Sequence, residues 1–200
     1  MTYRLPNGTI ASFSTAFSEK ITLKEISNAD PVIAVVDGDK KMAVDDVWYA
    51  QRTGWHGLRN RVGVIGPLLN GNKVTLRGID STNTQIFKKG YDTTTTARVV
   101  TAWESFPEST EISISGGEQQ YYKYRTISAQ IPTNKSPLVI HFETIYDHGG
   151  PWYEAVQKID RRREIVVLRI KYEDGNAMYL SGYLSSTRFC VHSEPTIIEA

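Results

Sequence analysis

The order of secondary structure is set by GGEQQYYKYRTI (116–127), PLVIHFETIY (137–146), PWYEAVQKIDRRR (151–163) and EIVVLRIKYEDGNAMYLSGYLSS (164–186). The first two segments are rich in β-branched and aromatic residues, which favour strands. The third has helical spacing, and the fourth has the pattern of a hairpin. A single helix between β-segments predicts a sheet with one helical cover, so its two faces should have different roles.

The predicted helix covers residues 151–163. Pro151 suits the first turn of a helix, where its missing N–H costs nothing. An apolar stripe follows at positions i, i+3, i+4 and i+7, formed by Trp152, Ala155, Val156 and Ile159. We expect Trp152, Val156 and Ile159 to pack the helix against the sheet.

The predicted hairpin turns at Asp174-Gly175, which is typical of two-residue turns between strands. Side chains alternate along its first strand. Val166, Leu168, Ile170 and Tyr172 share one face, while Val167, Arg169 and Lys171 share the other. The first face is expected to meet the core, and the second to meet water or a partner.

The rest of the chain is also predicted to be mainly β. Residues 1–28 are interpreted as an N-terminal arm with the first strands. Residues 29–100 form a small β-insert of short strands, with a hairpin at Asn70-Gly71. Residues 101–200 form a core sheet with helix 151–163. Within that core, residues 104–118 are expected to form a long loop, because they include Pro107, Ser109, Gly116 and Gly117.

Composition excludes several classes of protein. The formal net charge is +1 and charged residues make up 22% of the chain, without a basic stripe for nucleic acid. One cysteine rules out an internal disulfide framework and fits a reducing compartment. The N-terminus does not resemble a signal peptide, and no apolar run is long enough to cross a bilayer, so no membrane partner is expected.

Candidate chemistry is weak throughout. His141 and Glu143, with Asp147 and His148 nearby, could offer metal ligands, but the spacing matches no recognised site. Cys190 and His192 alternate on a possible strand without the signals of an activated thiolate. Three tyrosines could stack on bases or could simply favour a strand: Tyr121, Tyr122 and Tyr124. No catalytic residue, cofactor or metal is expected, because phosphate-binding and nucleophile motifs are also missing.

The ordered set of segments resembles the tail tube (major tail) proteins of long, non-contractile-tailed bacteriophages. The matching motifs are Gly-Gly-acidic-Gln-Gln at 116–120, Thr-x-Lys-Ser at 133–136, Pro-Trp-Tyr at 151–153 and Gly-Tyr-aliphatic-Ser at 182–185. Upstream, NADPVIAVVDGD, TGWHGLRNRV and VTLRGIDSTNTQIF resemble the small β-insert of many such proteins. The resemblance covers nearly the whole chain.

The resemblance implies a β-sandwich or barrel with one flanking helix and no enzyme activity. Six copies would form a ring, and rings would stack into a tube through which genome DNA passes without specific binding. Such a protein is assembled in the host cytoplasm and resides in the virion tail, with tape measure, terminator and tip proteins as partners.

Two surfaces are expected on this basis. The face lining the lumen or a subunit seam would carry Lys123, Arg125, His141, Glu143, Arg169 and Lys171. The ring-stacking loop would carry Pro107, Ser109, Gly116 and Gly117.

Alternatives remain open. The chain could be another ring-forming tail protein, such as a terminator or a minor tail protein. It could also be a secretion-system tube protein or a non-catalytic carbohydrate-binding β-module, if its four tryptophans converge on one platform. At the C-terminus, the family pattern continues into another strand, whereas TIIEA (196–200) after Pro195 is expected to be too short to pair fully.

Overall fold

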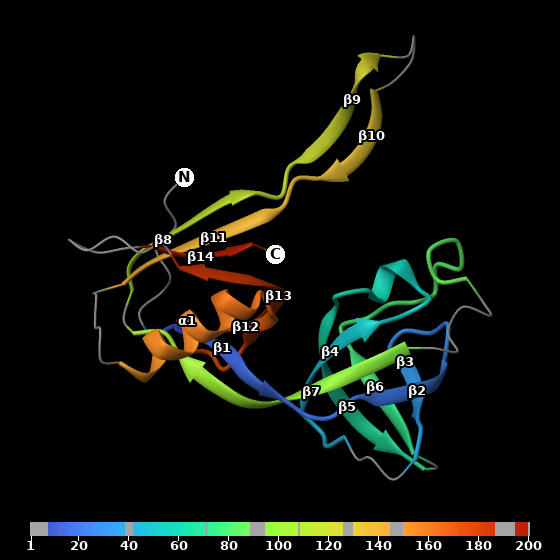
Figure 1. Cartoon of the computed structure of the whole chain (residues 1–200). Helices are drawn as coiled ribbons and strands as arrows, with labels where there is room; N and C mark the ends of the chain where they lie inside the picture. Colours follow the sequence, from blue (N-terminus) through green and yellow to red (C-terminus); the bar gives the residue numbers. More distant parts are fainter. Residues whose placement is uncertain are drawn as a thin grey trace.

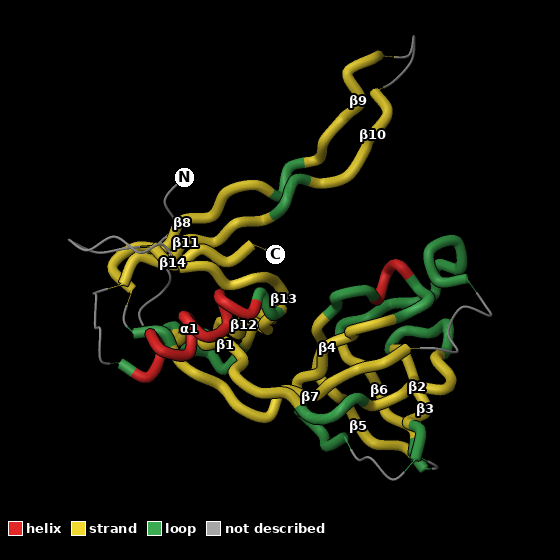
Figure 2. The backbone as a smooth tube through the Cα atoms, in the orientation of Figure 1, coloured by secondary structure: helices red, strands yellow, loops and turns green. Residues whose placement is uncertain are grey.

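The computed structural model describes residues 8–38, 42–70, 72–88, 95–107, 109–125, 130–144, 150–186 and 195–199; side chains are described except at 56, 109–112, 119–135 and 195–199. Strands dominate, with one α-helix and a short 3₁₀ turn among these residues (Figure 2). The strands are β1 (Ile10–Phe17), β2 (Ile21–Ile26), β3 (Val32–Val36), β4 (Val47–Arg52), β5 (Val62–Leu69), β6 (Lys73–Arg77), β7 (Thr95–Ser105), β8 (Ser109–Gly116), β9 (Gln119–Arg125), β10 (Gln130–Lys135), β11 (Leu138–Thr144), β12 (Ile165–Lys171), β13 (Ala177–Ser186) and β14 (Pro195–Glu199). The helices are η1 (His56–Leu58) and α1 (Pro151–Arg162). The predicted fold class, mainly β with one α-helix, is confirmed.

Six strands close into a small barrel in the order β2-β3-β6-β5-β4-β7, with β7 pairing back to β2. Alternate residues point into it, so Trp48 and Ala50 of β4 are fully buried. The interior is filled by a cluster that includes Leu23, Trp55 and Leu76. Since every strand of this ring has two neighbours, the barrel has no free strand edge.

Strand β7 and six further strands form a sheet in the order β7-β1-β12-β13-β14-β11-β8 (Figure 1). This sheet is curled. Phe106, just after β7, has its ring 4.8 Å from Phe13 of β1 and 5.0 Å from Phe142 of β11. Strands β12, β13 and β14 separate β1 from β11 in the sheet, so one side chain can touch both only if the sheet bends around it. The concave, inner face therefore encloses the core, and the convex face is the outer one.

Helix α1 closes the concave side of the sheet. Its buried residues Trp152, Val156 and Ile159 join one cluster with Phe142, Leu168 and other apolar side chains from β1, β11, β12 and β13. At its C-terminal end Asp160 accepts a hydrogen bond from the backbone N–H of Ser186 at 3.2 Å, and Gln157 donates one to the Ser186 hydroxyl at 2.8 Å. Arg163 ends the helix in the left-handed conformation, at φ 49°.

Strand β7 belongs to both parts of the molecule. Its first half pairs with β2 and β4, for example Ala97 with Ile21 and Ala50, and its second half pairs with β1 from Val100 to Ser105. The division of the chain at residues 28 and 100 stays a prediction. In the structure β2 pairs within the barrel, and β7 runs on past residue 100.

The prediction of a long loop over residues 104–118 is wrong. Strand β7 runs to Ser105, and β8 occupies residues 109–116. It pairs antiparallel with β11, in one register from Glu111 to Gly116 and with a register shift before Ser109. Apolar Ile112 and Ile114 alternate with polar residues there, which is a strand pattern. Pro107 and the Gly116-Gly117 pair mark only the two ends of this strand.

The C-terminal segment forms β14, which pairs with β13 on one side and β11 on the other. The expectation that this segment could not pair fully is therefore wrong. Pro195 is tolerated because it stands at the first residue of the strand, where a missing N–H disturbs the ladder least.

We expect Trp152→Ala to lower the free energy of unfolding by about 3–5 kcal/mol, because it empties a large buried site between helix and sheet. Urea unfolding followed by circular dichroism measures this loss. Lys158→Ala, on the exposed side of the same helix, should change stability by less than about 0.5 kcal/mol. Equal effects of the two substitutions would show that Trp152 does not hold the helix in place.

Candidate assembly surfaces

The barrel docks on the outer face of the curled sheet. Trp48 and Ala50 point into the barrel, so Val47 and Tyr49 point out of it, and they form a buried cluster with Val167 of the sheet. Five partly buried side chains complete this joint: Phe17, Val62, Trp103, Ile165 and Tyr179. The joint is apolar and continuous, so it holds the two parts together without relying on their connections alone.

Asn60 links the two parts through hydrogen bonds. It follows η1 and takes the left-handed conformation, at φ 59°. Its side-chain oxygen accepts a bond from the Tyr49 hydroxyl at 3.0 Å, and its backbone carbonyl accepts one from the Ser181 hydroxyl of β13. Its own N–H donates to the carbonyl of Ala50. One residue thus ties η1, β4 and β13 together.

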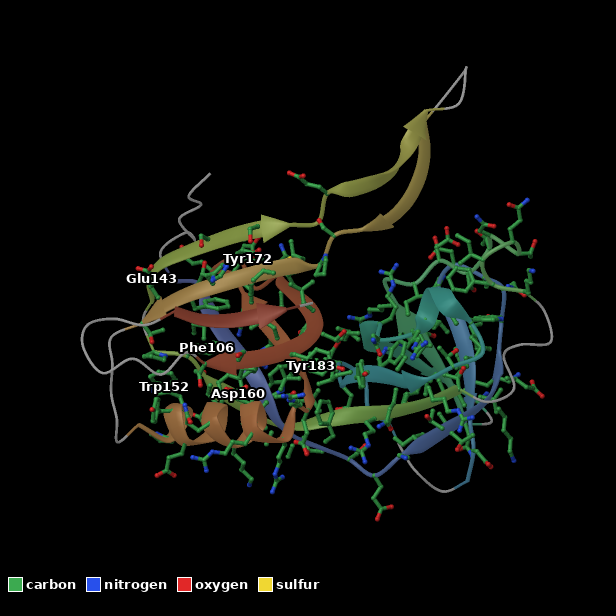
Figure 3. The ribbon with its side chains drawn as sticks, turned by 45° about the horizontal axis from the view of Figure 1, so that its top comes forward. Phe106, Glu143, Trp152, Asp160, Tyr172 and Tyr183 are labelled. Atoms are coloured by element: carbon green, nitrogen blue, oxygen red, sulfur yellow. The ribbon has the colours of Figure 1, made fainter. Side chains whose placement is uncertain are left out.

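Burial at the joint raises the pKa of Tyr49 above its usual value. Desolvation of the phenol is the largest cause, the nearby Tyr183 acts in the same direction, and Arg59 opposes both. Tyr183 itself is half-exposed where the sheet meets the barrel (Figure 3). The neutral phenol is the form that donates to Asn60, so the raised pKa and the hydrogen bond favour the same protonation state.

Arg169 and Trp103 cover part of the outer face beside this joint. The guanidinium carbon of Arg169 lies 4.3 Å from the centre of the Trp103 ring, in a cation–π contact. Between β12 and β7 lies β1, with Ser12 and Ser14 in register with Arg169 and Trp103. The two small serines are fully covered, because the larger pair meets over them. Arg169 is thus packed along the surface rather than extended from it.

Four of the residues expected to line a lumen or seam lie on the outer face of the curled sheet, but in two separate regions of it. Directly opposed residues of antiparallel strands point to the same side. By the registers through β13 and β14, His141 and Glu143 of β11 therefore share the outer face with Arg169 and Lys171 of β12. The curl of the sheet turns these strands apart, and Glu143 lies at the end of the sheet far from the barrel (Figure 3). Their common role stays a prediction.

Several candidate residues lie outside the described part of the chain. Lys123 and Arg125 lie on β9, but their side chains are not described, and the same is true of the three tyrosines beside them. Asp147, His148, Cys190 and His192 fall in undescribed segments. Within the described residues, no group of three or more His, Cys, Asp or Glu side chains could hold a metal, and no helix could span a membrane.

The remaining named residues have definite places. Ser109 and Gly116 are the first and last residues of β8, Pro107 precedes that strand, and Gly117 follows it. Trp152, Val156 and Ile159 point into the core from α1. The ring-stacking role stays a prediction for the first four residues.

The sheet has two free edges and an extension. Among the described strands, β8 pairs only with β11, and the second half of β7 pairs only with β1. Strands β9 and β10 continue β8 and β11 as a separate two-stranded ribbon that projects from the sheet (Figure 1). Within the described residues these edges have no further strand partner, and unpaired edges of this kind can pair with other chains.

Comparison with known proteins identifies the family. The family model described as "Phage tail tube protein, TTP" matches residues 53–199, which include β5, β6 and β7 of the barrel and every strand of the curled sheet except β1. No curated protein and no solved structure matches the chain. The chain belongs to the phage tail tube protein family, whose members are structural proteins of the virion tail.

We expect Tyr49→Phe to change the dependence of stability on pH. The folded pKa is raised above the unfolded one, so the contribution of Tyr49 is complete below the unfolded value of 10.0 and is lost as the pH rises through the folded value. At pH 8 the variant should lose about 0.5–1.5 kcal/mol with the hydrogen bond to Asn60. Above pH 10 this deficit should shrink, as measured by urea unfolding at each pH. A deficit that stays constant would contradict the assignment.

Proposed function

We propose that this member of the phage tail tube family is the repeating subunit of the tube itself. Six copies close into a ring, rings stack into a tube, and genome DNA passes through it during ejection. Its role is mechanical rather than catalytic, and the neighbouring tail proteins are the tape measure, terminator and tip proteins.

The observation that carries this proposal is an open sheet with two different free edges. Strand β8 ends the sheet on one side and the second half of β7 ends it on the other. A contact between unlike edges of neighbouring copies is heterologous, and such contacts close into rings when the rotation allows it. Strand addition at an edge supplies main-chain hydrogen bonds over the whole length of the contact.

The projecting ribbon supports stacking of the rings. An isolated two-stranded ribbon is marginally stable in water, so β9 and β10 require a covering surface. The ribbon extends away from both the sheet and the barrel (Figure 1). A copy in the next ring is the surface that this proposal assigns to it. The barrel, closed and without free edges, is then a decoration of the ring rather than part of its strand pairing.

The purified chain is expected to form stacked rings or tubes visible by electron microscopy after concentration. Replacing residues 119–135 by an Asn-Gly turn should leave the circular dichroism spectrum of a folded sheet and abolish the tubes, because the ribbon is removed while β8 and β11 stay paired. Single rings from the parent chain would favour the terminator alternative. A parent chain that stays monomeric under all assembly conditions would contradict the proposed function.

We also expect only weak, salt-sensitive binding to duplex DNA. A conduit must not hold the passing phosphates, and each phosphate that is neutralised adds to affinity. Fluorescence anisotropy with a labelled duplex at several salt concentrations measures this directly. Sub-micromolar, sequence-selective binding at physiological salt would be incompatible with a conduit.

A further inference from the structure

A defined bend joins the curled sheet to the projecting ribbon. On one side of the bend β8 and β11 are paired, and on the other β9 and β10 are paired. Gly116 and Gly117 lie at the bend with φ of +80° and +76°. Residues with a Cβ atom rarely adopt this conformation, whereas glycine adopts it readily. Two successive left-handed residues turn the chain sharply, so the ribbon leaves the sheet in a new direction.

Gly116 is also required for space. A Cβ atom at this position would lie 1.9 Å from the carbonyl oxygen of Pro137 on the opposite strand. That oxygen is a backbone atom and cannot rotate away as a side chain would. At Gly117 the nearest atom to such a Cβ, a methyl carbon of Leu138, lies at 3.4 Å, which is an ordinary contact. The close approach of the two backbones therefore depends on Gly116 above all.

Ser136 fixes the bend from the opposite strand. Its N–H donates to the carbonyl of Glu118 at 2.9 Å, and its hydroxyl accepts from the N–H of Glu118 at 3.0 Å. The N–H of Gly117 donates to the carbonyls of Ser136 and Pro137. The backbone groups of the bend are thus paired across the two strands, which makes the bend a set angle rather than a loose hinge.

We propose that this bend is a positioning element that sets the direction in which the ribbon reaches a second copy of the chain. The angle decides which part of the neighbouring ring the ribbon meets, and hence the rotation from one ring to the next. This inference rests on the proposed function, since it takes the partner of the ribbon to be another subunit.

Gly116→Ala tests the inference, with Gly175→Ala as the matched control. Gly175 has φ +85° in the β12–β13 turn, and nothing lies within 4 Å of a Cβ built there. The two variants therefore share the backbone strain, and only Gly116→Ala adds the clash with Pro137. We expect Gly175→Ala to form tubes with the parent twist, and Gly116→Ala to form none or to form tubes with a different twist, as measured by helical reconstruction.

Ser136→Ala gives a second test if Gly116→Ala fails to fold. It removes only the hydroxyl contacts to Glu118, and it should raise the critical concentration for tube formation by about two- to tenfold. Ser136→Thr keeps a hydroxyl and should restore assembly toward the parent value. Parent-like assembly and twist in both Gly116→Ala and Ser136→Ala would overturn the inference while leaving the tube function intact.

A measurement on the isolated subunit separates the two proposals. Two nitroxide spin labels report the ribbon direction by pulsed dipolar spectroscopy. They are attached to cysteines introduced by Lys123→Cys on the ribbon and Lys158→Cys on α1, in a Cys190→Ser background that removes the native thiol. The parent and Gly175→Ala should give the same narrow distance distribution, and Gly116→Ala a shifted or broadened one. An unchanged distribution in Gly116→Ala would refute the bend as the element that sets direction, whether or not tubes form.

Discussion

The structure depends on one strand, β7, which takes part in both the barrel and the sheet. Its first half closes the barrel against β2, its second half ends the sheet beside β1, and Phe106 directly after it fills the centre of the curl. A shift of one residue would move Ala97 and Val99 out of the barrel interior. It would also displace Val100 from the joint. The barrel, the joint and the curled core are therefore fixed by one register.

This arrangement divides the surface into regions with different capacities for assembly. The strands of the barrel all have two neighbours, so they offer no edge for pairing with a strand of another molecule. The sheet keeps two free edges and continues into the ribbon. Part of its outer face is already covered, by the barrel at Val167 and by Arg169 against Trp103. Among the strands that the structure describes, only those at the sheet edges and in the ribbon can therefore pair with another chain.

Local patterns predicted the elements that local chemistry determines. The apolar stripe from Trp152 gave the helix, Asp174-Gly175 gave the hairpin, and alternation along β12 gave the two faces of the strand. The same logic failed over residues 104–118, where Pro107 and the glycines outweighed the alternation of Ile112 and Ile114. There the glycine pair suggests part of a loop, whereas the N–H groups of Gly117 and Glu118 are hydrogen-bonded across the bend.

The joint could not have been predicted in the same way. Asn60 and Ser181 meet across 121 residues of sequence, and neither lies in a pattern that signals a partner. Only the left-handed conformation of Asn60 could be anticipated from the sequence, since asparagine adopts it more readily than most residues. Trp103 and Arg169 likewise meet only because Ser12 and Ser14 are small enough to lie beneath them.

Because the sheet is curved, the alternation of residues along a strand predicts which side of the sheet a side chain is on, but not the direction in which it points from the subunit. One side of the sheet carries four polar residues of β11 and β12: His141, Glu143, Arg169 and Lys171. In a flat sheet they would form one continuous polar surface. Phe106 holds β1 and β11 to a common centre, so the outer face turns through a large angle between β12 and β11. Residues of one parity then point in different directions from the subunit. In a ring, the outer face at β11 and the outer face at β12 cannot both face the axis, so one of them must face a neighbour or the solvent. The assignment of polar residues to a lumen therefore depends on the assembly axis, which in the proposed tube is set by edge pairing and the ribbon direction together.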